Sequence, residues 1–275
     1  MPKKNLSSSG PTGPLSVGNV VSASLRIYRD HFKSYFSLAL VAYLWLLVPI
    51  YGWAKYSAIA GLISRLAFGE VREKPETVSD ARREVNPRMW SFLWAGILTF
   101  LIFLGVSLVS GIAMFFVGMG AGALFGQNFT LVAAFLLVAV IAFLIIYIRL
   151  FSRLLIIEVP LAIENNIGAS SAIGRSWKLT KGSVGRIQWI VFVGILVSLP
   201  ITIVVQILTV IVQVFLSKVL GPESGLFYLV YYIMIVGVSI GSGALVTPFW
   251  QAMKAIIYYD VRSRKEGLGL QMRDR

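Results

Sequence analysis

The sequence predicts an all-α integral membrane protein, a polytopic helical bundle with about six membrane segments and basic interfacial helices. Composition is the first observation, because hydrophobic residues make up 57% of the 275 residues and charged residues only 13%. Soluble domains carry about a quarter charged residues. The second observation is that several apolar stretches exceed the roughly 20 helical residues that cross a bilayer core about 30 Å thick. The rest of the chain offers no soluble domain for an ordinary enzymatic core.

Four of the predicted segments are full membrane spans. No charged residue occurs between Met89 and Ile148, so this run is expected to cross twice and to turn in the glycine-rich stretch 119–129. Two further apolar stretches are separated by the short turn that follows Lys218. The predicted spans cover about residues 90–118, 129–150, 187–216 and 226–256.

The first apolar block, residues 34–68, is interrupted by Pro49, Gly52 and Lys55. It is generous for one span and short for two, since each full span needs about 20 residues. A kinked short hairpin or a re-entrant pair around Pro49 and Gly52 would leave both ends in the cytoplasm. A single crossing would place the N-terminal part outside. We favour the hairpin, which brings the total to six segments.

Short amphipathic helices are expected before the apolar blocks. Residues 17–33 place Val20, Val21, Leu25, Tyr28 and Phe32 on one helical face, which suits the membrane interface. In the mixed-charge segment 69–88, a short helix is expected after Thr77 or Ser79 as N-cap.

These helices indicate a threefold internal repeat. The pattern Ala23-x-x-Arg26-Ile-Tyr28-Arg29 matches Ala172-x-x-Arg175-Ser-Trp177-Lys178, and Ser79-Asp-Ala-Arg82-Arg83 is a degenerate third copy. Each copy precedes an apolar run. The chain is therefore expected to consist of three units, each a basic interfacial helix followed by a helical hairpin.

The net charge of +13 is distributed unevenly. Basic residues concentrate in 55–88, 149–186 and 254–275, which is the positive-inside pattern of cytoplasmic loops. This distribution argues against nucleic acid as a partner and favours a cell (cytoplasmic or inner) membrane, with the C-terminus in the cytoplasm and the N-terminus expected there too. The domain prediction is a disordered tail at 1–15, one transmembrane domain at 16–260 and a basic cytoplasmic tail at 261–275.

Three short motifs resemble a known family. They are Pro160-Leu-Ala-Ile-Glu164, the run Ala172-Ile-Gly-Arg175-Ser-Trp-Lys-Leu-Thr-Lys-Gly182, and the ending Tyr258-Tyr-Asp-Val-Arg-Ser-Arg-Lys-Glu-Gly267. Together they resemble the membrane domain of glycerophosphoryl diester phosphodiesterases and of related stand-alone bacterial membrane proteins, over about residues 16–270. The resemblance implies an all-helical bundle. In that family the phosphodiesterase is a separate catalytic domain with a His- and carboxylate-containing metal site, which this chain lacks, so the resemblance implies no phosphodiesterase activity.

Few residues offer catalytic chemistry. The chain has no cysteine and one histidine, His31, which we interpret as an interfacial surface residue rather than a ligand or base. Glu158 and Glu164 flank Pro160 at a membrane boundary, where paired carboxylates could relay protons. Ion pairing with Arg149, Arg153 or Arg175 is the favoured reading. We therefore predict a non-enzymatic protein without cofactor or metal.

The basic clusters are the first candidate site. On interfacial helices they could bind anionic lipid headgroups or a membrane protein partner, each residue contributing about 1 kcal/mol near the surface. The alternative is topology anchoring, with long side chains reaching toward the interface. The candidate residues are Arg26, Arg29 and Lys33, then Arg175, Lys178, Lys181 and Arg186, and finally Arg262 and Arg264, with Lys265 beside them.

A polar stripe is the second candidate site. Thr202, Gln206, Thr209 and Gln213, preceded by Ser198, recur at spacings of four and three along one face of an apolar span. They could line a cavity for a small solute or a lipid headgroup, or simply form interhelical hydrogen bonds. The leading hypothesis is an organising or assembly protein that engages anionic lipid or a protein partner through its basic cytoplasmic face. The alternative is a transporter or lipid-handling protein that uses the stripe.

Overall fold

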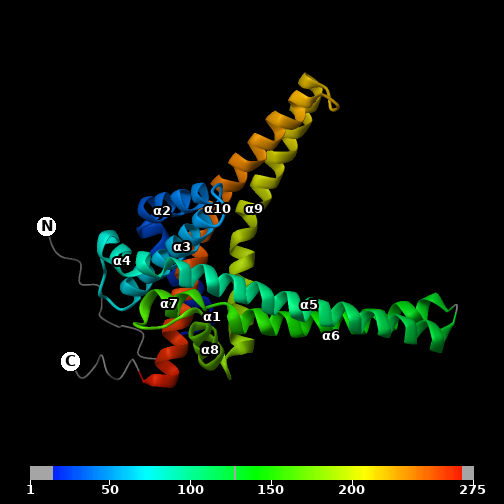
Figure 1. Ribbon diagram of the computed structural model, residues 1–275, viewed down its shortest axis with the longest axis horizontal. Coiled ribbons are helices and arrows are strands. Elements are labelled where there is room, and N and C mark those ends of the chain that lie inside the picture. Colours follow the sequence, from blue (N-terminus) through cyan, green and yellow to red (C-terminus); the bar gives the residue numbers. More distant parts are fainter. Residues whose placement is uncertain (1–14, 127, 268–275) are drawn as a thin grey trace.

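The computed structural model describes residues 15–126 and 128–267, and within these ranges the chain is helical with no strand (Figure 1). The predicted all-α class is confirmed. The elements are α1 (Val17–Asp30), α2 (Phe32–Trp45), α3 (Tyr51–Val71), α4 (Val78–Val85), the 3-10 turn η1 (Asn86–Arg88), α5 (Met89–Phe125), α6 (Phe129–Leu154), α7 (Glu158–Ile163), α8 (Ala169–Thr180), α9 (Val184–Leu220) and α10 (Gly225–Glu266).

Two long hairpins, α5–α6 and α9–α10, diverge from a common base (Figure 1). The base, as the word is used below, consists of α1, α4, α7 and α8 together with the adjoining ends of the four long helices. A third, shorter hairpin, α2–α3, packs against α10. Each hairpin follows a short helix in the chain, namely α1, α4 or α8.

Within the described residues, four helical stretches are long and apolar enough to cross a membrane, and they contain α5, α6, α9 and α10. Their bounds extend the predicted spans by several residues at most ends. The α2–α3 pair is not among them. The chain reverses between Trp45 and Tyr51, as the hairpin interpretation of the first block requires, but Lys55, Arg65 and Glu70 lie within α3. The structure thus supports an integral membrane protein with four of the six predicted segments as long apolar helices.

The buried core lies in the base and in the α2–α3 hairpin beside it. Its largest fully buried side chains include Ile63 of α3, Ile156 before α7, and Met253 and Tyr258 of α10. The hairpin arms are different, because they expose many large apolar side chains, such as Phe115 and Phe129. Monomeric soluble proteins rarely leave apolar patches of this extent uncovered. The arms are therefore suited to hydrocarbon and the base to an aqueous interface.

Part of the apolar face predicted for α1 packs against other helices and does not lie at the membrane interface. Its buried residues are Val20, Val21 and Ser24, which face the helices α9 and α10 that α1 packs against. Leu25 and Phe32, predicted on the face toward the membrane interface, are exposed. Leu25 belongs to α1 itself, whereas Phe32 is the first residue of α2, because α1 ends at Asp30.

Helix ends follow local signals. Thr77 caps α4, as one of the two predicted alternatives, by accepting a hydrogen bond from the Asp80 N–H at 3.2 Å. The glycine-rich stretch predicted as a turn is instead helical up to Phe125. The helix stops only at Gly126, which has a φ of 57° that favours glycine. The chain leaves α6 through Leu155–Ile157, and Pro160 lies in the first turn of α7, where proline is tolerated.

Residues 261–266, predicted as the start of a tail, continue α10 to Glu266. Residues 1–14 and 268–275, which carry most of the two predicted tails, lie outside the described residues.

Candidate functional site

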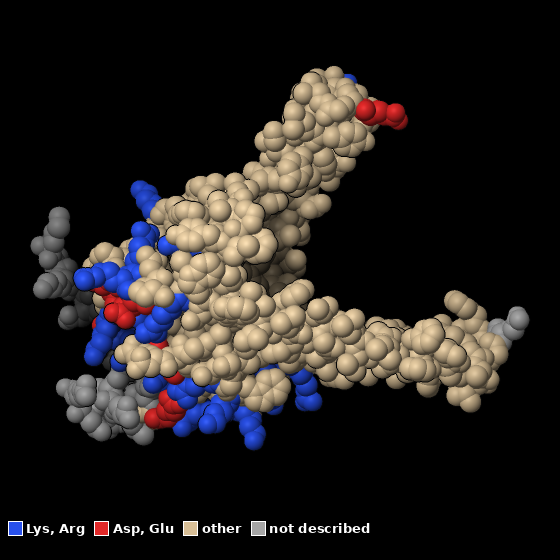
Figure 2. Space-filling view, viewed as in Figure 1, with Lys and Arg blue, Asp and Glu red and all other residues tan. Residues whose placement is uncertain are grey.

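Charged residues gather at the base of the molecule. Figure 2 shows Lys, Arg, Asp and Glu there, while the two hairpin arms are nearly free of charge on the face shown. The exception is the turn between α9 and α10, whose neighbourhood contains Lys218 and Glu223. This separation of charge from apolar surface is what a membrane boundary at the base requires.

Arg175 of α8 is the centre of an ion-pair network in the base. Its Nε lies 2.8 Å from Oε1 of Glu164, just after α7, and its Nη1 lies 2.5 Å from Oε1 of Glu266, the last residue of α10. Hydrogen bonding to Glu266, and then to Glu164, raises the pKa of Arg175 above its ordinary value despite the opposing desolvation. The network thus joins the α7–α8 region to the end of α10, which lies far from it in the sequence.

Two further α10 residues complete this network. The Tyr258 hydroxyl donates to Glu164 Oε1 at 2.5 Å, and Arg262 donates to the Tyr258 hydroxyl at 3.1 Å. Arg262 also pairs with Glu266 at 2.8 Å, one turn along the helix. All three motifs that carry the family resemblance contribute, through Glu164, Arg175 and the α10 residues.

Asp260 holds a second network and is buried. Its carboxylate lies 2.9 Å from Arg186 of α9 and 3.0 Å from Arg264, and it accepts a hydrogen bond from the Leu15 N–H at 3.2 Å. A buried carboxylate without partners would be costly, so these donors stabilise its charged form. Through Leu15, Asp260 also ties the start of the described chain to the end of α10.

The structure divides the predicted basic residues into two groups. Arg175, Arg186, Arg262 and Arg264 are engaged by acidic residues of the two networks, and Arg29 pairs with its exposed neighbour Asp30. The others are exposed and form no salt bridge with a described residue. Among them, Lys265 donates to the Lys178 carbonyl, and the remaining four, Arg26, Lys33, Lys178 and Lys181, are called the exposed basic set below.

The predicted ion pair between Glu164 and Arg175 is confirmed, but Glu158 pairs differently. Its partner is Lys254 of α10, not an arginine, and Gln251 Nε2 donates to the same carboxylate at 3.3 Å. Ser64 of α3 then donates to Gln251 Oε1 at 2.7 Å. A chain of four polar side chains therefore crosses α3, α10 and α7. Sequence reasoning missed Lys254 and Gln251, although they share one face of the helix at spacing i, i+3.

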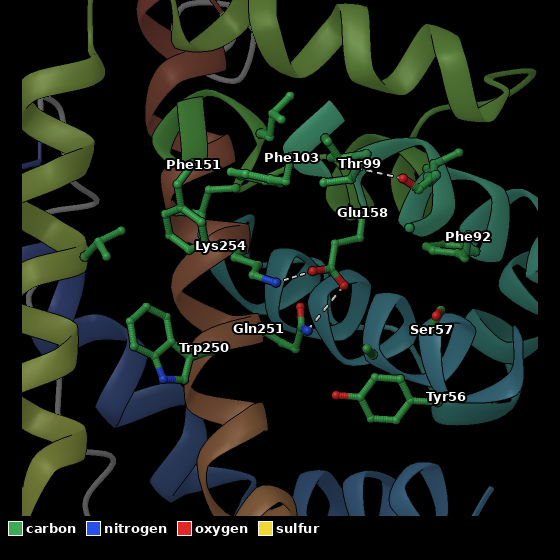
Figure 3. A pocket seen from close by; sticks show the side chains of 18 of the residues that line it. Tyr56, Ser57, Phe92, Thr99, Phe103, Phe151, Glu158, Trp250, Gln251 and Lys254 are labelled. Carbon is green, nitrogen blue, oxygen red and sulfur yellow. Dashed lines mark hydrogen bonds and ion pairs between the residues drawn. The ribbon is translucent and has the colours of Figure 1, made fainter. Parts of the chain in front are cut away.

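This polar chain ends at a cavity of about 610 Å³ between the two long hairpins. Figure 3 shows Glu158, Lys254 and Gln251 on one side of it, with aromatic side chains around them. Most of the lining is apolar and comes from α3, α5, α6, α9 and α10. Phe92, Phe103, Phe151, Leu154, Val191, Ile195 and Trp250 are among the lining residues.

The predicted polar stripe lies on the outer surface of α9. Gln206 and Gln213 are exposed, and no hydrogen bond joins their amides to another described residue. Thr202 and Thr209 donate to backbone carbonyls of their own helix, at Ser198 and Val205. Thr202 lines a small cavity of about 220 Å³ beside Tyr43 and Thr247.

Metal-binding geometry is absent from the described part of the chain, where no three His, Asp or Glu side chains lie together as a metal site requires. His31 lies 3.3 Å from Glu70 on α3, a partner that the sequence did not indicate.

No known protein family, curated protein or solved structure matches this chain. The resemblance to the phosphodiesterase membrane domain therefore stays a prediction.

Proposed function

We propose that this protein is a non-catalytic integral membrane protein that engages anionic lipid headgroups through its base, in an organising or assembly role. The observation that carries the proposal is the exposed basic set, Arg26, Lys33, Lys178 and Lys181, which the acidic residues of the described chain leave without salt bridges. Each such residue near a membrane surface attracts anionic lipid by about 1 kcal/mol.

The position of these residues supports the proposal. Lys178 and Lys181 lie at the end of α8, directly before α9 begins its membrane stretch at Val184. Lys33 lies in the first turn of α2, after the end of α1. Under the positive-inside rule the base faces the cytoplasm, where anionic lipids attract basic residues. Leu15 contacts Asp260 at the end of α10, so both ends of the described chain lie at the base. This holds whether the α2–α3 hairpin crosses the membrane or not.

The internal repeat belongs to the same proposal. Three short helices, α1, α4 and α8, each precede a hairpin, and the repeated Arg and Lys positions put basic side chains at each of these junctions. Three similar units around one base would present several headgroup contacts to one leaflet.

Native mass spectrometry tests the proposal directly. The protein, extracted in mild detergent, is given phosphatidylglycerol, and the fraction with bound lipid is measured. Replacing Lys178 and Lys181 by Gln removes two contacts of about 1 kcal/mol each, so the affinity for phosphatidylglycerol is expected to fall about 30-fold. Lys218→Gln, an exposed lysine at the opposite end of α9, is the matched control. Equal affinity of the double variant and the control would contradict the proposal.

The stripe-based alternative, transport or lipid handling, has less support. Its residues are spread along the outside of α9, and a solute path needs an enclosed polar route. The cavity between the hairpins is mostly apolar and partly open, and none of the stripe residues lines it.

A further inference from the structure

We propose that the cavity between the two long hairpins binds one zwitterionic phospholipid of the phosphatidylethanolamine type, independently of the exposed basic set. The phosphate would lie at Lys254, the ammonium at Glu158, and the beginning of an acyl chain along the aromatic wall.

The cavity has the size and the walls of a ligand site. Its volume of about 610 Å³ falls within the roughly 300–1,000 Å³ of known small-molecule sites, which are mostly apolar with a few placed polar groups. Phe103, Phe151 and Trp250 supply aromatic surface next to the ion pair (Figure 3). A ligand with an apolar body and one small polar end fits this combination.

The cavity opens toward the membrane. Phe151 and Ile195 line it and are still 44% and 46% exposed. They belong to α6 and α9, two of the four helices suited to span the bilayer. Whatever enters past these side chains therefore comes from the lipid phase, which makes a membrane lipid the occupant with the shortest route.

The charges select the headgroup. Lys254 and Glu158 compensate each other, so the cavity has no net charge from this pair and gives a purely anionic head no net attraction. Lys254 has three N–H donors, and its only described acceptor is Glu158. Two donors are left for phosphate oxygens. The Glu158 carboxylate, already accepting from Gln251 and Lys254, has lone pairs left for an ammonium group.

The polar chain behind the pair keeps it in place. Gln251 is buried and fixed by Ser64, which is itself buried, at 2.7 Å. The carboxylate is thus oriented before a lipid arrives, and a ligand does not have to pay for ordering it.

Gly96 offers a way to fill the cavity without disturbing the protein. It lines the cavity, and an added Cβ there meets no atom within 4 Å. Gly105, on the same helix and outside the lining, is equally open. Gly96→Leu and Gly105→Leu are therefore a matched pair, of which only the first occupies the proposed lipid position.

The experiment is native mass spectrometry of the full chain in mild detergent, given equimolar phosphatidylethanolamine and phosphatidylglycerol with identical acyl chains. We expect the original protein to retain one phosphatidylethanolamine. In Gly96→Leu the affinity for this lipid should fall about tenfold, which corresponds to about 1.4 kcal/mol. In Gly105→Leu the affinity should stay unchanged. In Glu158→Gln the cavity gains a net positive charge, so its preference should reverse toward phosphatidylglycerol. If Glu158 had only a structural role, Glu158→Gln would weaken the binding of both lipids alike.

Three results would overturn the proposal. In the first, Gly96→Leu retains as much phosphatidylethanolamine as the original protein. In the second, Gly96→Leu loses phosphatidylglycerol and not phosphatidylethanolamine. In the third, Glu158→Gln folds and its preference between the two lipids is unchanged. If Glu158→Gln does not fold, the two glycine variants decide alone. Replacing Lys178 and Lys181 by Gln lowers phosphatidylglycerol binding and leaves the phosphatidylethanolamine in place, so the two proposals can fail separately.

Discussion

Arg175 and Glu266 lie 91 positions apart in the chain, and their side chains meet at 2.5 Å between Nη1 and Oε1. The same guanidinium reaches Glu164 at 2.8 Å through Nε. One planar fork of donors thus holds two carboxylates that belong to different helices. Lysine, a point charge on a flexible stem, cannot reproduce this geometry.

Arg175→Lys is therefore expected to destabilise the base although it keeps the charge. Arg175 is largely shielded, with 23% of its side chain exposed, and hydrogen bonds to charged groups contribute about 1.5–3 kcal/mol each. Discounting for partial exposure, we expect a loss of about 1–2 kcal/mol. Thermal unfolding in detergent should show it as a drop of several degrees.

The matched control is Arg29→Lys. Arg29 also forms an ion pair, with Asp30, but its side chain is 80% exposed, and such surface pairs contribute little. Its melting temperature should equal that of the original protein. If both variants melt alike, the Arg175 network does not hold the base together.

The long helices could be predicted because their signal is local. The run without charge from Met89 to Ile148 is long enough for two spans, and Thr77 or Ser79 can each cap a helix, of which the structure uses Thr77. The glycine-rich stretch was assigned wrongly because glycine only weakens a helix, and in this apolar context the helix continues to Phe125.

The contacts within the base could not be predicted in the same way. Glu158 and Lys254 are 96 positions apart, and nothing in either neighbourhood indicates the other. Three nearer arginines were equally good partners by charge alone. Only the packing of α7 against α10 decides the choice, and with it the position of the cavity.

Gly61→Ala should be costly because α3 and α5 approach closely there. A Cβ at this position would overlap the ring of Phe92, which is buried. Forcing extra volume into a packed site costs about 1–3 kcal/mol. In the Phe92→Ala background the ring is gone, so adding Gly61→Ala should cost almost nothing more. Melting temperatures of the two single variants and the double variant form the measurement.

A matched glycine again provides the control. Gly96→Ala adds a Cβ that meets no atom within 4 Å on the same helix as Phe92, so the melting temperature should stay the same or rise slightly, because alanine favours a helix over glycine. Strict additivity of Gly61→Ala and Phe92→Ala would show that the overlap with the ring is not the cause.

Replacing Gln206 and Gln213 together by Leu tests the polar stripe. Both side chains are exposed on α9 without a described hydrogen-bond partner, and a polar amide facing hydrocarbon costs free energy. The double variant is therefore expected to insert normally and to be as stable as the original protein or more stable. Loss of cellular function despite normal insertion would instead favour the transport alternative, and a lower oligomeric mass would assign the stripe to helix association.

The absence of cysteine allows membrane topology to be tested with single cysteines. Glu223→Cys lies in the turn between α9 and α10, and Lys178→Cys lies at the base in α8. If α9 and α10 cross the membrane, an impermeant maleimide added to intact cells should label Glu223→Cys and not Lys178→Cys, and permeabilised cells should show labelling of both.

Val48→Cys, exposed in the turn between α2 and α3, reports on the short hairpin in the same assay. Labelling of Val48→Cys from outside means that α2–α3 crosses completely, which gives six segments. Protection in intact cells and labelling after permeabilisation leaves four crossings, with the short hairpin on the side of the base. Labelling of Lys178→Cys in intact cells would contradict the proposed cytoplasmic base.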